Sequence, residues 1–242
     1  MAASAALSPL SLTDRVQLLL QRVEYRRADT DDDREATYRL RYDAYLREGA
    51  IQPNFGRRFS DSHDDDDNAW IVGTYMDGVL TSSFRLHVAN RDYPDMPANQ
   101  VFKDFLDPEI AAGKTIIDPT RFVVDPAMAR VYPDLPYVTV RIGHMAAEHF
   151  DADIVLATVR AEHQAFYKRV FGHTVVCEPR PYPSLTKPIS LMMLDYPAER
   201  LKIVQRYPFF ASSVAERVTL FGQPEPSRRR VAAAGDRPAL VG

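Results

Sequence analysis

Tyr38-Arg39-Leu40-Arg41-Tyr42-Asp43-Ala44-Tyr45-Leu46-Arg47-Glu48 carries apolar and aromatic side chains at helical spacing. Its tyrosines and Leu46 form one stripe, which predicts a helix that ends near Gly49. Arginines interleave this stripe, and the acidic segment 61–67 follows shortly after it. Arginines beside carboxylates form charge-assisted pairs that fix loop geometry. A solvated amphipathic helix followed by a charged loop explains the same residues, so this stretch alone leaves both interpretations open.

Composition bounds the classes of protein that this chain can belong to. The 242 residues are 45% hydrophobic and 26% charged, as in globular proteins. The formal net charge of −3 gives no general reason to expect a nucleic acid partner. A single cysteine, Cys177, cannot form an internal disulfide, which favours a reducing compartment. No apolar run is long enough to be a transmembrane segment, and Met1–Leu12 lacks the basic region of a signal peptide, so we expect a cytoplasmic protein.

Outward from the first helix, the chain alternates strands and helices. Asp31-Asp32-Asp33 precedes that helix and complements its dipole, and Asp77-Gly78 predicts a type I′ hairpin turn. Pro119 should break the strand that contains it, because proline cannot donate to a ladder. Strands are predicted over 22–26, 70–76, 79–88, 114–124, 153–159, 173–177 and 189–194, and further helices over 13–20, 101–112, 137–150, 162–171 and 197–206. This order indicates an α/β fold with a mixed central sheet covered by helices on both faces.

The ends of the chain lack hydrophobic period. We expect a flexible N-terminal tail over 1–12, a single domain over 13–221 and a disordered C-terminal tail over 222–242. Thr13 or Asp14 should lie near the cap of the first short helix. Both tails should be dispensable for catalysis.

Polar and aromatic side chains on the first helix, in the acidic loop, late in the second hairpin strand and on either side of Pro119 are candidates for chemistry. They are Arg41, Tyr45, Asp61, Asp64, Arg85, Asp118 and Arg121. Asp118 and Arg121 lie three apart, so in a regular strand they would face opposite sides, and Pro119 must distort the strand if they share a site. Each of these residues can instead be half of a structural ion pair. The chain shows no metal-ligand spacing, no phosphate-binding glycine loop and no nucleophile elbow.

In their order and spacing these residues resemble a known motif set. Arg41-x-x-x-Tyr45, Asp61-x-x-Asp64, Arg85 and Asp118-x-x-Arg121-Phe122 are similar to the motifs of acyl-homoserine lactone synthases. The closer resemblance is to the long-chain N-acyl amino acid synthases, over roughly residues 22–195. It rests on 23–27, 38–51, 75–78, 83–88 and 160–172. Both families have the Gcn5-related N-acetyltransferase fold, so the resemblance implies that fold here.

The chain also departs from these relatives. Acyl-homoserine lactone synthases carry glutamate where this chain has Asp118, and typically a tryptophan after the first motif, where this chain has none. The acetyltransferase signature Gln/Arg-x-x-Gly-x-Gly/Ala, whose backbone N–H groups hold the coenzyme A pyrophosphate, is missing. Arg141-Ile142-Gly143-His144-Met145-Ala146 comes near it, with the glycine one place early. This displacement favours an acyl carrier protein as the acyl donor.

The resemblance implies an N-acyltransferase that moves a long acyl chain from acyl-phosphopantetheine on acyl carrier protein to the α-amine of an amino acid. No permanently bound cofactor is expected, and acyl-coenzyme A is an alternative donor. Asp118, kept ionised by Arg121, would be the base or the amine-binding carboxylate. Arg85 and Arg121 would order the acidic residues or hold the acceptor carboxylate. Arg41, Tyr45, Asp61 and Asp64 would shape the acceptor side, and backbone N–H groups around Phe122, Val123 and Val124 would meet the oxyanion.

Carrier proteins are acidic, so the resemblance also implies a basic docking patch. The candidates are Arg160, Lys168, Arg169, Lys202 and Arg206. Ordinary surface charge explains each of them equally well. Two other functions stay open at this point: a coenzyme A-dependent acetyltransferase, and a non-catalytic module of the same fold that binds carrier protein or lipid.

Overall fold

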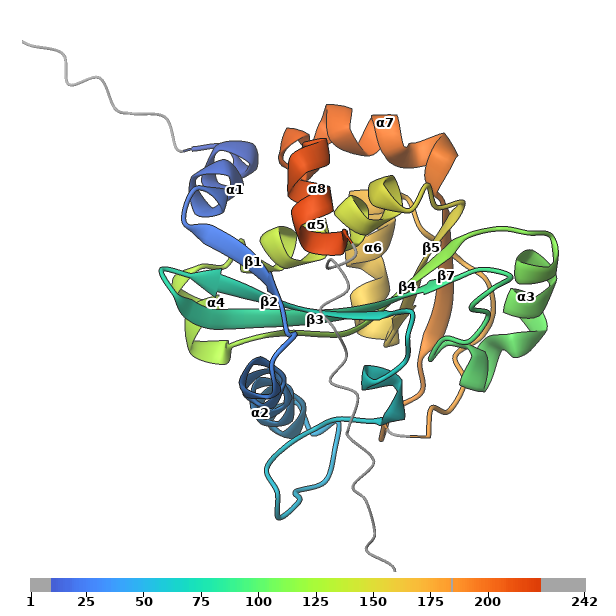
Figure 1. Cartoon of the computed structure of the whole chain (residues 1–242), viewed down its shortest axis with the longest axis horizontal. Coiled ribbons are helices and arrows are strands. Elements are labelled where there is room, and N and C mark those ends of the chain that lie inside the picture. The colour runs from blue at the N-terminus through green and yellow to red at the C-terminus, as the bar shows by residue number, and fades with distance from the viewer. Residues whose placement is uncertain (1–9, 184, 223–242) are drawn as a thin grey trace, which may run out of the picture.

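A seven-stranded mixed sheet forms the centre of the protein, in the order β1-β2-β3-β4-β5-β7-β6 (Figure 1). The computed structural model describes residues 10–183 and 185–222. Its strands are β1 (Val23–Arg27), β2 (Ala69–Met76), β3 (Val79–Ala89), β4 (Ile116–Val124), β5 (Ile154–Val159), β6 (Thr174–Val175) and β7 (Ser190–Asp195). Neighbouring strands pair antiparallel except β4 and β5, which pair parallel. The predicted mixed α/β sheet is confirmed.

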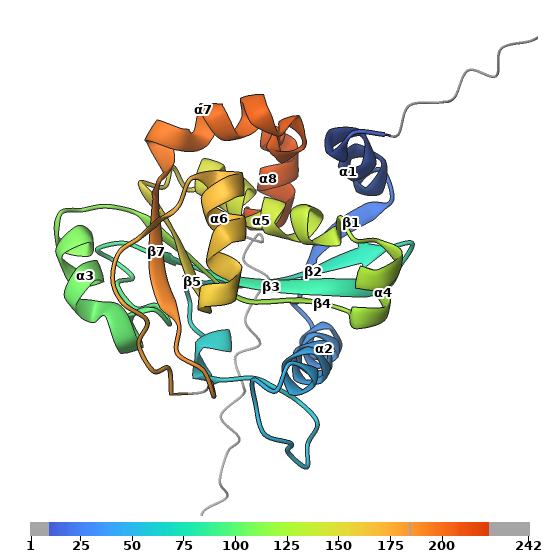
Figure 2. The ribbon, with the colours of Figure 1, turned by 180° about the vertical axis from the view of Figure 1, so that it is seen from behind.

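Helices lie on both faces of this sheet (Figures 1 and 2). They are α1 (Leu12–Leu20), α2 (Asp31–Arg47), α3 (Asn99–Ala111), α4 (Pro126–Val131), α5 (Leu135–His149), α6 (Gln164–Phe171), α7 (Tyr196–Arg206) and α8 (Val214–Phe221), with 3₁₀ turns η1 (Ser62–Asp64), η2 (Ala161–His163) and η3 (Pro208–Phe210). Helices α1, α5, α7 and α8 lie on one side of the sheet, while α2 and η1 lie on the other. None of the described helices is both long and apolar enough to cross a membrane.

Local sequence signals set most of these boundaries. The acidic triplet Asp31-Asp32-Asp33 forms the first turn of α2, so the helix begins earlier than predicted. The N-cap residue is Thr30, whose side chain accepts a hydrogen bond from the Asp33 N–H. The helix ends before Gly49 as predicted, where φ is +63°. Helix α1 is capped by Ser11 in a capping box with Asp14, so Asp14 lies near the cap as predicted and the helix begins one residue before Thr13.

The β2–β3 hairpin turns at Asp77-Gly78, as predicted. The φ angles of these two residues are +50° and +83°, the left-handed values that a type I′ turn requires. Glycine reaches such values without strain and aspartate is among the residues that tolerate them best. This turn fixes the register in which β3 carries Arg85 beneath α2.

The structure adds short elements that hydrophobic period does not reveal. Helices α4 and α8 were not predicted, and the strand expected over 173–177 is reduced to the two residues of β6 at the sheet edge. Residues 1–9 and 223–242 lie outside the described residues, so the two tails stay predictions, except that Leu12 already belongs to α1.

Strand β3 separates two kinds of buried layer. Phe84, Leu86 and Val88 point into the main hydrophobic core with α5. The alternate residues Arg85 and His87 are equally buried and lie on the α2 side. This alternation follows from the two-residue period of a strand. It puts an apolar core on one face of the sheet and a charged layer on the other.

Candidate active site

Five of the predicted residues form a buried network of ion pairs, here called the charged layer: Arg41, Asp61, Asp64, Arg85 and Arg121. The Asp64 Oδ1 atom accepts hydrogen bonds from Arg41 Nη1 at 2.7 Å and from Arg85 Nη1 at 3.0 Å. Arg85 Nη1 also donates to Asp61 Oδ1 at 2.5 Å, and Arg121 donates to Asp61 Oδ2. Residues from α2, the loop before η1, β3 and β4 are thereby tied together.

Burial makes these pairs different from surface salt bridges. The Arg41, Asp64 and Arg85 side chains are at most 1% exposed. Burial raises the pKa of the Asp61 carboxyl, but the Arg85 and Arg121 guanidinium groups outweigh it and hold that pKa below its usual range. For Asp64, Arg41 and Arg85 likewise outweigh burial, so its pKa is also lowered. Both carboxylates are therefore ionised at neutral pH.

The local backbone explains how the two carboxylates reach the arginines. Asp61 caps η1 by accepting a hydrogen bond from the His63 N–H at 3.1 Å. Asp64 reaches back and accepts one from the Asp61 N–H at 3.0 Å. This capping box holds both carboxyl groups in fixed orientations, with their remaining lone pairs turned to the guanidinium groups. Asp61 and Asp64 lie three residues apart in the sequence because a capping box pairs the N-cap residue with the third residue of the helix.

Arg121 enters the charged layer because β4 bulges. Ser83 pairs with Val123 and Arg85 with Thr120, so two residues of β4, Arg121 and Phe122, oppose Phe84 alone. The φ angle of Arg121 is +53°, an uncommon value for a residue other than glycine. A bulge re-aims a side chain in this way. The strand is distorted as the sequence analysis required, but at Arg121 rather than at Pro119, through which the β3–β4 pairing continues.

Asp118 does not lie where the sequence analysis expected it. It is fully buried opposite His87, and its Oδ2 accepts a hydrogen bond from the Ala98 N–H at 2.9 Å. Burial raises the pKa of Asp118 to about 6, against the lowering effect of the Ala98 N–H and of Arg85. The expectation that Arg121 keeps Asp118 ionised was wrong, because the bulge turns Arg121 to Asp61 instead.

A cleft of about 690 Å³ opens where β4 and β5 separate. The two strands pair only at Ile116–Ile154 and Ile117–Val155. Pro119, which follows closely, has no N–H to donate, so it cannot extend the ladder to β5. The cleft is lined by residues 44–45, 47–48 and 50 at the end of α2, 119–124 of β4, 126 and 129–130 of α4, Pro136 of α5, 158–160 at the end of β5, His163, 166–167 of α6, and 185, 187 and 189.

The cleft and the charged layer meet at Arg121. Among the predicted residues, Tyr45, Arg121, Phe122, Val123, Val124 and Arg160 line the cleft, whereas Arg41, Asp61, Asp64, Arg85 and Asp118 do not. Asp118 was expected to face the cleft, and this expectation was wrong. The Arg121 guanidinium lies 5.7 Å from the ring centre of Tyr45 and 4.3 Å from that of Phe59. Arg121 thus connects the buried network with the open space.

Several residues that line the cleft were not predicted from the sequence. Glu48 is the single carboxylate among the lining residues, and it is outnumbered by cationic side chains. Besides the predicted Arg121 and Arg160, these are Arg47, Arg130 and Lys187. Arg160 pairs with Glu48 at 2.7 Å. Arg130 belongs to α4, a helix too short for its period to be recognised, and Lys187 lies in the proline-rich loop. Their convergence depends on tertiary structure, which sequence spacing does not record.

The predicted docking residues do not form one patch at the cleft. Arg160 lies in the cleft wall, whereas Lys168 and Arg169 occupy the last turn of α6. Arg206 Nη1 donates to the Arg169 carbonyl at 3.0 Å, and Lys202 pairs with Glu199 at 2.7 Å. The first of these contacts joins α7 to α6, and of the five residues only Arg160 lines the cleft.

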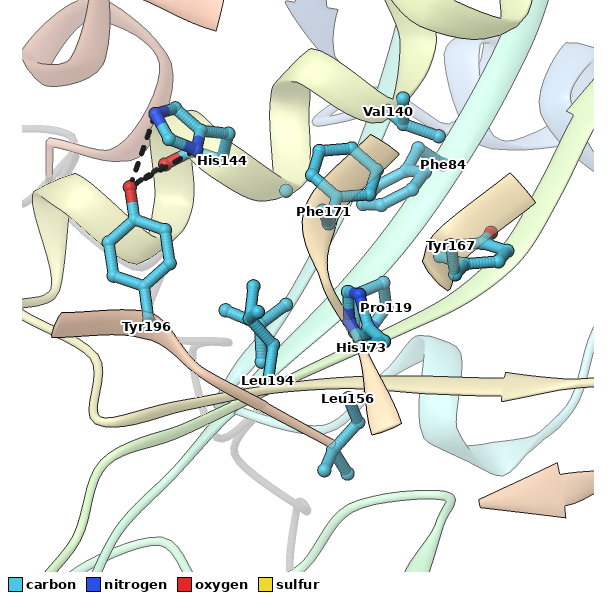
Figure 3. Close-up of a pocket in the computed structure, with 12 residues that line it drawn as sticks. Phe84, Pro119, Val140, His144, Leu156, Tyr167, Phe171, His173, Leu194 and Tyr196 are labelled. Atoms are coloured by element: carbon cyan, nitrogen blue, oxygen red, sulfur yellow. Dashed lines mark hydrogen bonds between the residues drawn. The ribbon is translucent and has the colours of Figure 1, made fainter. Parts of the chain in front are cut away.

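Behind the cleft lies a small apolar cavity of about 30 Å³, between β4, β5 and α5 (Figure 3). Pro119 and Tyr167 line both spaces. Figure 3 shows aromatic and leucine side chains around it, with a hydrogen bond of 3.2 Å between Tyr196 and His144 at one end. Burial lowers the pKa of His144 to about 4, so this ring is neutral at neutral pH.

The displaced acetyltransferase signature serves packing in this chain. Gly143 lies in the middle of α5, where a Cβ would come within 3.3 Å of the Phe84 ring. Arg141 donates to the Phe209 carbonyl at 2.9 Å and pairs with Glu216 at 2.9 Å, which ties α8 to α5. The N-terminus of α5 instead carries Asp134, paired with Arg15 at 2.7 Å.

The mixed sheet that opens between β4 and β5, with helices on both faces, has the Gcn5-related N-acetyltransferase fold that the sequence predicts. A profile of the family described as "N-acyl amino acid synthase FeeM" matches residues 36–195. The chain therefore belongs to the FeeM family of N-acyl amino acid synthases, and it is an N-acyltransferase. The predicted resemblance is confirmed, and the non-catalytic alternative is excluded.

Solved structures show the same fold at low sequence identity. FeeM, an N-acyl amino acid synthase from uncultured soil microbes, aligns with a TM-score of 0.63 at 18% identity, over 76% of this chain and 96% of FeeM. BjaI, a coenzyme A-dependent acyl-homoserine lactone synthase solved with MTA, aligns with a TM-score of 0.54 at 15% sequence identity, over 82% of this chain and 97% of BjaI. The acyl-homoserine lactone synthase LasI aligns with a TM-score of 0.50 at 13% sequence identity, over 86% of this chain and 98% of LasI. No curated protein matches the chain.

Proposed function

We propose that this enzyme transfers a long acyl chain from the phosphopantetheine arm of acyl carrier protein to the α-amine of an amino acid. The amine nitrogen attacks the thioester carbonyl, the C–N bond forms, and the C–S bond breaks to release the thiol. The observation that carries the proposal is the cleft between β4 and β5, which meets the charged layer at Arg121. We also propose that the enzyme works in the cytoplasm, where such donors are made.

The edge of β4 supports the donor side of this proposal. Beyond Ile117 this strand has a ladder partner only in β3, so its other edge faces the cleft over 119–124. Backbone N–H groups on such an edge can bind the pantetheine amides and the oxyanion near Phe122, Val123 and Val124. The cleft volume of about 690 Å³ lies within the usual range for a small-molecule site. The apolar cavity is small, about 30 Å³, so we place the long acyl chain in the larger cleft.

The N-terminus of α5 supports a carrier protein rather than coenzyme A as the donor. A helix N-terminus binds phosphate through free N–H groups and its dipole. Here Asp134 supplies a carboxyl group at that position, and Pro136 follows in the first turn without an N–H. A coenzyme A diphosphate would bring more negative charge to this carboxyl group, which pairs with Arg15 at 2.7 Å, than the single phosphodiester of a phosphopantetheine arm. Docking of the carrier protein at Arg160, Lys168, Arg169, Lys202 and Arg206 remains part of the proposal.

The α2 end of the cleft supports the acceptor side. Tyr45 and Arg121 line it, and an arginine pairs with a carboxylate through charge-assisted hydrogen bonds. We place the acceptor carboxylate at Arg121, whose orientation Asp61 and Arg85 fix from behind. Asp118 does not reach the cleft, so it acts on the substrate through the charged layer near Arg85 rather than by direct proton transfer.

A donor competition tests this function. The purified enzyme is given one acyl chain, either on acyl carrier protein or on coenzyme A, together with a mixture of amino acids, and products are identified by mass spectrometry. We expect an N-acyl amino acid, formed faster from the carrier protein. A clear preference for coenzyme A would overturn the donor, and release of thiol without any amide product would overturn the reaction.

A further inference from the structure

Three metal-ligating side chains converge beside the charged layer, and none of them lines the cleft. His63 comes from η1, Asp66 follows it in the same loop, and His87 comes from β3. Their ligand atoms lie within 4.8 Å of one another. His63 Nδ1 lies 2.7 Å from Asp66 Oδ2, and His87 Nε2 lies 3.1 Å from the same oxygen. His87 Nε2 also lies 3.1 Å from the His63 carbonyl oxygen.

This spacing suits a transition metal. Zinc binds histidine nitrogen and carboxylate oxygen at about 2.0–2.2 Å in tetrahedral geometry, which puts neighbouring ligand atoms roughly 3.3 Å apart. Two imidazoles and one carboxylate, with a position left open, match the donor set of zinc and related divalent metals rather than of calcium or magnesium. The side chains are 17%, 31% and 0% exposed, so the cluster is largely enclosed but reachable from solvent.

Surrounding residues already orient the ligands. The side-chain amide of Gln100, at the start of α3, lies 2.6 Å from His63 Nε2. With the amide turned so that its oxygen faces the ring, Gln100 would accept the Nε2–H of an imidazole that binds metal through Nδ1. His87 is held in β3 by strand pairing on both sides. The acyl transfer to an amino acid uses none of the three ligands.

We propose that His63, Asp66 and His87 form a binding site for a divalent transition metal such as Zn²⁺. The sequence alone does not reveal this site, because Asp66 and His63 lie 21 and 24 residues from His87 and no ligand spacing connects them. His63 and Asp66 flank Asp64, so a bound metal would fasten to β3 the loop that carries Asp61 and Asp64. The inference is independent of the acyl donor and acceptor, and its failure would leave the proposed function untouched.

Metal titration of the full chain tests this site without measuring activity. Tag-free protein is treated with chelator and titrated with ZnCl₂ by calorimetry, and Co²⁺ is added separately to record its visible spectrum. We expect one Zn²⁺ per chain with a Kd of about 1 μM or tighter, a tetrahedral Co²⁺ spectrum, and a rise in Tm on adding Zn²⁺.

Variants show whether these residues bind the metal. His63→Ala and the conservative Asp66→Asn should each weaken Zn²⁺ binding by about tenfold or more, because each removes a direct ligand. Asp67→Asn, at an exposed position of the same loop, should leave it unchanged. Circular dichroism checks that each variant is folded. Absence of Zn²⁺ binding to the unmodified chain, binding that survives both ligand variants, or equal affinity for Mg²⁺ would show that the three residues form only a hydrogen-bonded cluster.

Discussion

The two faces of β3 are equally buried and chemically opposite. Leu86 is 0% exposed against α5, and its neighbour Arg85 is 1% exposed against α2. Burying an aliphatic side chain is favourable by itself, whereas burying ionised groups costs several kcal/mol per ion and is only repaid by good pairing. A fold that needed only stability would place apolar residues on both faces. The difference supports our proposal that the α5 face holds the sheet together and that the charged layer is kept for the acyl transfer.

Arg85→Leu should produce the largest effect, because Arg85 joins both carboxylates of the charged layer. The substitution leaves Asp61 and Asp64 with fewer partners in a buried site, and breaking a buried ion pair costs about 3–5 kcal/mol of unfolding free energy. Urea unfolding measures this loss, and kinetics under conditions where the variant is folded should show reduced kcat/KM as well. A loss below about 1 kcal/mol would mean that the layer is more open to water than its burial indicates.

Asp118→Asn should change how stability depends on pH. The pKa of Asp118 is about 6 in the folded protein and its ordinary value is 3.8, so the folded state binds the proton more tightly than the unfolded state. Stability from this group is therefore complete below about pH 4, is lost as pH rises to about 6, and then stays constant. The shift of the Asp118 pKa from 3.8 to about 6 corresponds to a loss of about 3 kcal/mol of unfolding free energy.

Unfolding of both proteins by urea across this pH range checks the effect. Relative to the unmodified chain, the asparagine variant should gain stability between about pH 4 and pH 6 and no further above it. Parallel curves for the two proteins would show that the Asp118 carboxyl is not desolvated. Asp92→Asn, the same chemical change at an exposed position, serves as the control for unrelated pH effects.

Ile117→Val should have the smallest effect, since it deletes one buried methylene from the apolar face next to Asp118. Such a change costs about 1 kcal/mol of unfolding free energy. The Ile117 side chain is fully buried in the core with α5, so kcat and both KM values should stay unchanged. Altered kinetics in this variant would show that the two faces are coupled, and that the α5 face does more than hold the sheet together.

How far the sequence could predict this molecule depends on the range of each signal. Asp77-Gly78 and the stripe on α2 are local, and the structure confirms both. The order of the motifs predicted five site residues that form one hydrogen-bonded network in the structure: Arg41, Asp61, Asp64, Arg85 and Arg121. The prediction that Asp118 faces the cleft beside Arg121 was wrong. A bulge two residues after Pro119 decides which side chains of β4 face the cleft, and no local sequence pattern marks that bulge. Arg130 and Lys187 were missed because only the folded chain brings them to one cleft.

Arg121 should bind the acceptor while the open edge of β4 binds the donor. Steady-state kinetics of Arg121→Lys, with each substrate varied in turn, separate these two roles, because lysine keeps the charge but loses the paired hydrogen bonds of a guanidinium. Arg130→Lys, at the α4 end of the cleft, is the matched control. We predict that Arg121→Lys raises KM for the amino acid by about tenfold or more, leaves KM for the acyl donor unchanged, and that the control does not raise KM for the amino acid. A rise in KM for the donor with unchanged KM for the amino acid would contradict this assignment of the two substrates.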